Sequence, residues 1–178
     1  MKKANVLTNF NFLAKDLDWD DIYQSMLPKL FNYFLYRTRD EKIAEDLSSI
    51  TLERTWSNKW RYRSDLASVQ SWIFGIARNV FREYLREYRK SSSRSIPLEP
   101  EDSQPDLFDR NKFDTKIQLK RLVSMLPEKE QELVALKYGA GLNNREIAKL
   151  LHLSESNVGT RLFRTVESLR NKMEADNE

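Results

Sequence analysis

The sequence predicts an all-α protein made of two small helical domains with a flexible acidic linker between them. Its 178 residues include only four glycines and five prolines but many Leu, Ile, Glu, Lys and Arg, which favours helices over sheets. Apolar residues recur every three or four positions through both halves of the chain. Between the halves, residues 91–114 lose this periodicity and hold three of the five prolines, which is typical of a linker.

Charge is distributed unevenly, although the net charge is only +3. Residues 57–90 carry eight Lys or Arg against three Asp or Glu, and residues 137–172 carry seven against three. The segment between them, residues 91–115, carries three against six. Two basic blocks separated by an acidic spacer indicate two surfaces for one polyanion, such as a nucleic acid.

Composition also excludes several classes of site. The chain has no cysteine and a single histidine, His152, so disulfides, thiolate metal sites and histidine clusters are not available, and we expect no metal or cofactor. No secretory signal opens the chain, and no apolar run approaches the roughly 20 residues of a membrane span. We therefore expect a cytoplasmic protein without direct membrane insertion.

Three helices are predicted in the N-terminal half. Periodic apolar residues predict the first over residues 19–39, where Pro28 either kinks the helix or opens its second part. The second follows at residues 41–57. An aromatic and basic loop leads to the third, residues 71–90, which has one aromatic-aliphatic face and one face of arginines.

The C-terminal half contains a helix-turn-helix pattern. Asn143 or Asn144 can cap a short helix, with Glu146 placed for a capping box. Ala148 is small enough for a close helix crossing, and His152 occupies the turn, where the backbone needs a positive φ. A second helix follows, and its outward face offers short polar groups and guanidinium groups suited to base edges and phosphates. These residues are Ser156, Asn157, Thr160, Arg161, Phe163 and Arg164.

Both halves resemble the extracytoplasmic-function (ECF) sigma factors of bacterial RNA polymerase, in the sigma-70 family. The stretches AEDLSSITLERTW and SWIFGIARNVFREYLR resemble their domain 2, and LNNREIAKLLHLSESNVGTRLFRTVESLR is similar to the helix-turn-helix of their domain 4. The resemblance implies domain 2 at residues 1–90, the linker at 91–114 and domain 4 at 115–178. Domain 2 would dock on polymerase and melt the −10 promoter element, and domain 4 would read the −35 element.

The resemblance also implies roles for individual residues. In the −10 element, Arg78, Arg82 and Arg86 would contact phosphates, and Asn79 would read a base. Capture of an unstacked base would fall to Trp60, Tyr62 and Arg63, because stacking on an aromatic ring contributes about 1–3 kcal/mol per base. Docking on the clamp helices of the largest polymerase subunit would use Glu45, Asp46, Leu52, Glu53 and Trp56, although Leu52 and Trp56 also fit a core role. The other implied partners are the polymerase flap region, promoter DNA and, in many members of the family, an anti-sigma factor linked to a stress or envelope signal.

The sequence departs from the family pattern at two places. Ser48 and Ser49 stand where an aliphatic residue and Gln or Asp are usual, which bears on the detail of polymerase docking. Gly159 replaces a basic residue, which removes one expected −35 contact. Because a tether of about 25 residues orients two domains only loosely, we also expect no fixed spacing between the two DNA-reading surfaces of the free protein.

Two other functions fit parts of the sequence. A stand-alone helix-turn-helix repressor or activator would bind duplex DNA tightly by itself, but it leaves the aromatic and basic block at residues 57–90 unexplained. A helical nucleic-acid-processing enzyme would need a carboxylate or histidine cluster for metal. The adjacent acidic residues Glu45 and Asp46 point in different directions on a helix, so they do not form a catalytic pair. We therefore expect a sigma factor, which is not an enzyme.

Overall fold

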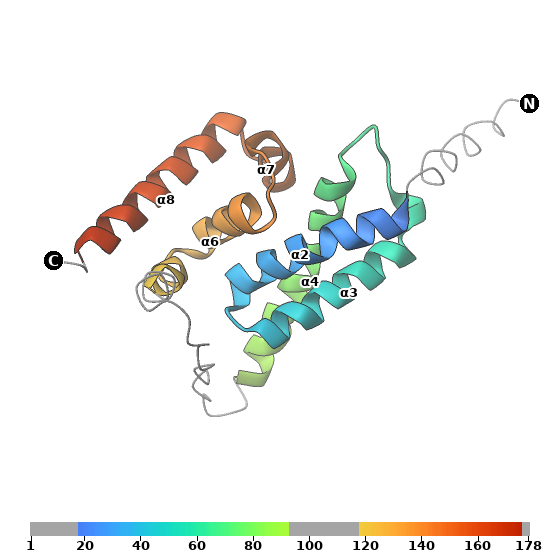
Figure 1. Cartoon of the computed structure of the whole chain (residues 1–178), viewed down its shortest axis with the longest axis horizontal. Helices are drawn as coiled ribbons and strands as arrows, with labels where there is room; N and C mark the ends of the chain where they lie inside the picture. The colour runs from blue at the N-terminus through green and yellow to red at the C-terminus, as the bar shows by residue number, and fades with distance from the viewer. Residues whose placement is uncertain (1–17, 93–117, 176–178) are drawn as a thin grey trace, which may run out of the picture.

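A computed structural model describes residues 18–92 and 118–175 of the chain (Figure 1). Within these ranges it contains helices and turns but no strand, which confirms the all-α prediction. Almost the whole of the expected linker, as well as residues 1–17 and 176–178, lies outside the described residues. None of the described helices is both long enough and apolar enough to cross a membrane.

The N-terminal half is a bundle of three helices, α2 (Trp19–Thr38), α3 (Glu41–Ser57) and α4 (Val69–Ser92). Aspartates start the first two helices, because the side chains of Asp18 and Asp40 accept hydrogen bonds from the first-turn N–H groups of α2 and α3. Pro28 lies inside α2 without ending it. A short 3-10 turn, η1 (Lys59–Arg61), follows α3. Helices α2 and α3 pack side by side, and α4 packs against both (Figure 1).

Helix α3 packs against its neighbours through a seam of small hydroxyl residues. Ser48, Thr51 and Thr55 are buried, and each hydroxyl donates to the carbonyl four residues earlier at 2.6–2.8 Å. Because each of these buried hydroxyl groups donates to a backbone carbonyl, the seam contains no unpaired hydroxyl donor that would destabilise the bundle. Ser48 and Ser49 are the residues at which α3 departs from the family pattern. Ser48 lies in the core and not on the docking face, whereas Ser49 is exposed.

The C-terminal half begins with a helical segment at residues 118–124 and continues with α6 (Glu128–Val134). A π-helical turn, η2 (Ala135–Gly139), extends α6 and is followed by α7 (Asn144–Leu151) and α8 (Glu155–Ala175). The C-terminal part of α8 packs on the 118–124 segment through a small cluster formed by Leu122, Val123, Val134 and Leu169.

The two halves are packed together, which differs from the loose orientation that the tether length predicts. A single hydrophobic cluster runs through both halves and includes Leu30, Phe34 and Phe74 of the first half. From the second half the same cluster takes in Leu133, Leu136, Leu142, Ile147 and Val158. The length of a tether limits only how far two domains can separate, and buried apolar surface between them determines whether they do.

The backbones of the two halves lie close together where η2 packs on α2. A Cβ atom added to Gly139 would lie 3.0 Å from the backbone N and Cα of Tyr33. Tyr33 is fully buried at this crossing. Only glycine allows two backbones to lie this close, so Gly139 sets the distance between the halves.

Candidate nucleic-acid interface

The helix-turn-helix forms as the sequence predicts. Asn143 accepts a hydrogen bond from the Glu146 N–H at 2.9 Å, and the Glu146 carboxylate accepts one from the Asn143 N–H at 3.0 Å. This reciprocal capping box starts α7. His152 ends α7 in the left-handed region with φ 56°, as expected for the turn position. Ser154 then caps α8 by accepting a hydrogen bond from the Asn157 N–H at 3.2 Å. Ala148 is buried in the helix crossing, as predicted.

The outward face of α8 is open to solvent. Val158, Leu162 and Leu169 are buried, which turns the opposite side of the helix outward. The exposed residues there include Ser156, Asn157, Thr160, Phe163 and Arg164. Phe163 is 66% exposed, so its ring is accessible to a partner. An aromatic ring and a guanidinium group side by side can contact a thymine methyl group and a guanine edge.

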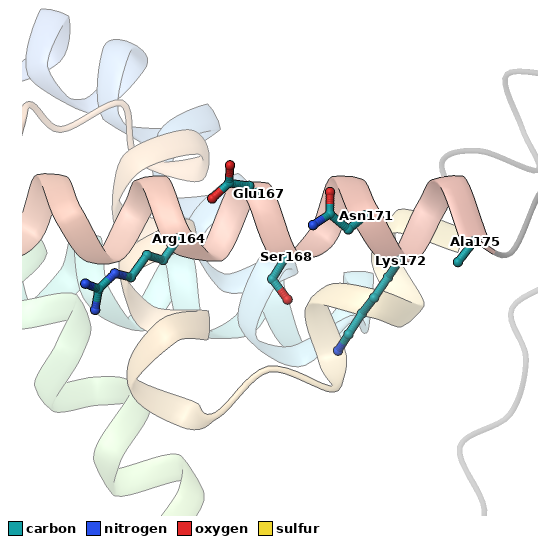
Figure 2. A pocket seen from close by; sticks show the side chains of 6 residues that line it. All are labelled: Arg164, Glu167, Ser168, Asn171, Lys172 and Ala175. Atoms are coloured by element: carbon teal, nitrogen blue, oxygen red, sulfur yellow. The ribbon is translucent and has the colours of Figure 1, made fainter.

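A hollow continues along α8 beyond these residues (Figure 2). Its lining consists of Arg164, Glu167, Ser168, Asn171, Lys172 and Ala175. All six residues come from one helix, so the hollow has no opposing wall and does not enclose a small molecule. The row of exposed polar side chains is better suited to an extended, charged surface.

Arg161 does not lie on the outward face. Its Nη2 is 2.6 Å from Glu130 Oε1 on α6, and each side chain is only about a quarter exposed. The ion pair ties α8 to α6 within the C-terminal half. The sequence places Arg161 among the DNA-contacting residues because helical spacing alone does not reveal a partner 31 residues away.

The arginine face of α4 is divided between solvent and protein. Arg82, Arg86 and Asn79 are exposed. Together with Arg89 and Lys90, Arg82 and Arg86 line a basic hollow near Glu128. Arg78 is different, because it turns toward the C-terminal half and is only 12% exposed. The expected phosphate contacts therefore remain accessible at Arg82 and Arg86 but not at Arg78.

The loop between α3 and α4 contains one aromatic side chain that is free to stack. Trp60 is 67% exposed, and the Arg61 guanidinium lies 5.7 Å from the centroid of its ring. Tyr62 instead packs on Trp72 at a ring distance of 5.4 Å, and its hydroxyl donates to the Ala67 carbonyl. Partial burial raises the pKa of Tyr62 above its usual value.

Arg63 forms an ion pair with Asp65 within the same loop, 2.7 Å between Nη2 and Oδ2. The hydrogen bond from Arg63 holds the pKa of Asp65 below its usual range. The structure thus places the three predicted base-capturing residues in one loop, but it leaves only Trp60 with an open aromatic face.

The predicted docking face on α3 is partly exposed. Glu45, Asp46 and Glu53 face solvent, and Trp56 is 57% exposed. The Trp56 ring is held by Lys59 Nζ at 3.2 Å and by the edge of Trp19 at 6.4 Å. Leu52 is only 6% exposed, so it belongs to the core and does not contribute directly to a docking surface. Ile50, which the sequence does not single out, is 36% exposed on this helix.

In the part of the chain that the structure describes, no group of three or more His, Asp or Glu residues is arranged to hold a metal ion. The site that the structure offers consists of exposed arginines, polar groups and aromatic rings on α8, on α4 and in the loop before α4. Such groups bind phosphates and bases.

Two family models match the chain: Sigma-70 region 2 over residues 22–91, and Sigma-70, region 4 over residues 116–169. The sequence is 30% identical over 157 residues to ECF RNA polymerase sigma factor SigM of Bacillus subtilis (strain 168), covering 85% of this chain and 92% of that protein. It is 26% identical over 154 residues to ECF RNA polymerase sigma factor RpoE of Cereibacter sphaeroides, covering 86% and 84%.

Two solved structures share the fold. The sigma factor RpoE from Bartonella quintana, in complex with the anti-sigma factor NepR, matches with a TM-score of 0.73 and 20% identity, over 89% of this chain and 98% of that one. CnrH in complex with the cytosolic domain of CnrY matches with a TM-score of 0.62 and 18% identity, over 96% of both chains.

Proposed function

Because this chain belongs to the ECF RNA polymerase sigma factors and recognises promoters, we propose how its exposed faces divide that work. Domain 2, residues 1–90, docks on core polymerase and handles the −10 element, and domain 4, residues 115–178, reads the −35 element. The observation that carries the proposal is the pair of exposed faces, one on α8 and one on α4 with its preceding loop, which lie in the separate segments that match regions 4 and 2.

On domain 4, Thr160, Phe163 and Arg164 enter the major groove. Their exposure and position near the N-terminal end of α8 fit the way in which a recognition helix approaches base edges. Arg161 positions α8 through Glu130 and is not a reader in this assignment.

On domain 2, Arg82 and Arg86 contact phosphates, Asn79 reads a base and Trp60 receives an unstacked base of the −10 element. Glu45, Asp46 and Glu53 dock on the clamp helices of the largest subunit, with Trp56 as their apolar neighbour. The flap region of the polymerase would hold domain 4. The polymerase also supplies the catalysis and its metals, so this chain is not itself an enzyme. We place its work in the cytoplasm.

We expect that the packed form is too small to contact both elements at once. They lie about 25 base pairs apart, or about 85 Å along a duplex that rises ~3.4 Å per pair. The 21 residues of α8 span only about 30 Å, and both halves share one core. The proposal therefore includes a separation of the two halves when the protein acts on polymerase.

An anti-sigma factor is a further proposed partner, in response to a stress or envelope signal. The support is that both structural neighbours were solved with a partner, NepR called an anti-sigma factor in one case and the cytosolic domain of CnrY in the other.

The test is reconstitution with core polymerase on genomic DNA, followed by sequencing of transcripts and footprinting of the promoters found. We expect footprints over both elements only when polymerase and this protein are present together. Specific nanomolar operator binding by the purified protein alone, unaffected by added polymerase, would contradict the assignment and favour the stand-alone repressor.

A further inference from the structure

Among the polar contacts between the two halves are those of Arg78, one of the predicted phosphate-binding arginines. Its Nε lies 2.7 Å from Glu132 Oε1, and its Nη2 lies 3.5 Å from Glu132 Oε2. Its Nη1 donates to the Leu150 carbonyl at 2.7 Å. Glu132 lies on α6 and Leu150 near the end of α7, so both acceptors come from the other half of the molecule.

We propose that these contacts form an autoinhibitory latch, in which Glu132 and Leu150 occupy Arg78 and keep the polymerase-free protein closed. The proposal rests on the role assigned to Arg78 in binding a promoter phosphate. A carboxylate presents a pair of oxygens to the guanidinium fork much as a phosphate does. The Leu150 carbonyl adds the negative end of the α7 dipole. Arg78 can therefore reach DNA only after these bonds break.

Further polar contacts involve the N-terminal end of α4 and the residue before it. Gln70 Nε2 donates to the Ala140 carbonyl at 2.9 Å, and its Oε1 accepts from Lys29 Nζ at 3.1 Å. Ser68 donates to Glu146 Oε1 at 2.8 Å. Glu146 is the capping-box residue of α7, so the start of the helix-turn-helix is attached to the loop that precedes α4. The bonds of Gln70 and Ser68 to the second half thus add to those of Arg78.

The fit between the halves is also specific in shape. Gly139 leaves room for the Tyr33 backbone, whereas an added Cβ would lie at 3.0 Å from it. At the same interface, a Cβ added to Gly75 would meet only Leu150 Cδ1 at 3.8 Å, an ordinary contact. The chain therefore offers two glycine-to-alanine changes at one interface, of which only one should force the halves apart.

Four variants test the latch. Glu132→Gln removes the charge that pairs with Arg78, and Glu130→Gln is its matched control, because Glu130 pairs with Arg161 inside the C-terminal half. Gly139→Ala forces the interface open, and Gly75→Ala is its matched control. Circular dichroism checks that each variant retains its helices.

The absence of cysteine allows clean labelling for energy transfer. Lys42→Cys on α3 and Asn171→Cys on α8 place one dye at an exposed position in each half. Because Glu132→Gln removes the charge that strengthens the hydrogen bonds to Arg78, it should shift the closed–open equilibrium toward the open form by about tenfold or more. Gly139→Ala should lower the transfer efficiency as well, and both controls should match the wild type.

Adding core polymerase should lower the transfer efficiency of the wild type, and Glu132→Gln should bind polymerase more tightly than Glu130→Gln. The latch is overturned if all four variants show the transfer efficiency of the wild type. It is also overturned if Glu130→Gln opens the protein as much as Glu132→Gln does. A wild type that fails to bind polymerase would instead contradict the proposed function, while the comparison of the free variants would still decide the latch.

Discussion

Trp60 and Tyr62 lie two residues apart in one loop, but the structure gives them different surroundings. Tyr62 has its ring against Trp72 and its hydroxyl on the Ala67 carbonyl, so it shapes the loop. Trp60 remains 67% exposed. Opening a base pair costs a few kcal/mol, and stacking on an aromatic ring returns about 1–3 kcal/mol per base. Only the exposed ring can supply this energy without first breaking protein contacts.

Trp60→Ala should therefore reduce promoter melting while leaving polymerase binding nearly intact. A template with a premelted −10 bubble should restore part of the activity, because stacking no longer has to offset unpairing. Permanganate reactivity of unpaired thymines measures the melting. Tyr62→Phe is the control, since it keeps the ring and loses one hydrogen bond of about 1 kcal/mol. Normal melting by Trp60→Ala would rule out this role.

Arg164 is the guanidinium group on the outward face of α8 that we assign to the −35 element. Arg164→Ala should weaken recognition of that element by roughly 1–3 kcal/mol, the contribution of a bidentate contact with a guanine. Scrambling the −35 element should then cost the variant little further activity. Arg170→Ala removes the same charge from an exposed position farther along α8 and controls for general electrostatics. Equal discrimination by wild type and Arg164→Ala would show that Arg164 reads no base.

At the scale of elements, α3 and α4 are held together by apolar packing and by an ion pair at their surface. Arg54 Nη2 lies 2.7 Å from Glu83 Oε2, with both side chains about two-fifths exposed. The hydrogen bond from Arg54 lowers the pKa of Glu83 below its usual range. Because solvent screens such a pair, it contributes less than about 1 kcal/mol to the free energy of unfolding.

Glu83→Gln should accordingly destabilise the protein slightly at pH 7, as measured by urea unfolding. A carboxyl group whose pKa is lower in the folded state stabilises the fold above its unfolded pKa of about 4.3, and this stabilisation is lost as the pH falls through the folded value. The difference between the wild type and Glu83→Gln should therefore shrink as the pH falls below the unfolded pKa, and it should vanish once the pH lies below the folded pKa as well. A difference that persists there would mean that the glutamine disturbs packing and not charge.

At the scale of the whole molecule, sequence reasoning succeeded where the cause is local. The capping box at Asn143, the left-handed turn at His152 and the all-α class all follow from residues a few positions apart. Contacts such as Arg78 with Glu132, 54 residues away, have no local signal. The same holds for the pairing of Arg161 with Glu130 and the burial of Leu52. Packing between the two halves decides the first of these three, and packing within each half decides the other two.

Assembly with polymerase is the step that the exposed acidic residues of α3 should control. Glu45 and Asp46 face solvent away from the contact between the halves, so they remain available in the closed form. Reversing both charges, in Glu45→Lys with Asp46→Lys, should weaken binding to core polymerase by on the order of tenfold at low salt and by less at high salt, because interactions between exposed charges are screened. A titration with labelled protein at two salt concentrations, in the absence of DNA, measures both effects.

The control for this assembly prediction is Glu167→Lys with Glu174→Lys, which makes the same change of charge on exposed positions of α8. Circular dichroism should show unchanged helix content for both double variants, since none of the four side chains is buried. If the two double variants lose the same affinity, net charge governs binding and α3 is not the docking face. If only the α3 variant loses affinity, and the loss diminishes with salt, then α3 meets a basic surface of the polymerase.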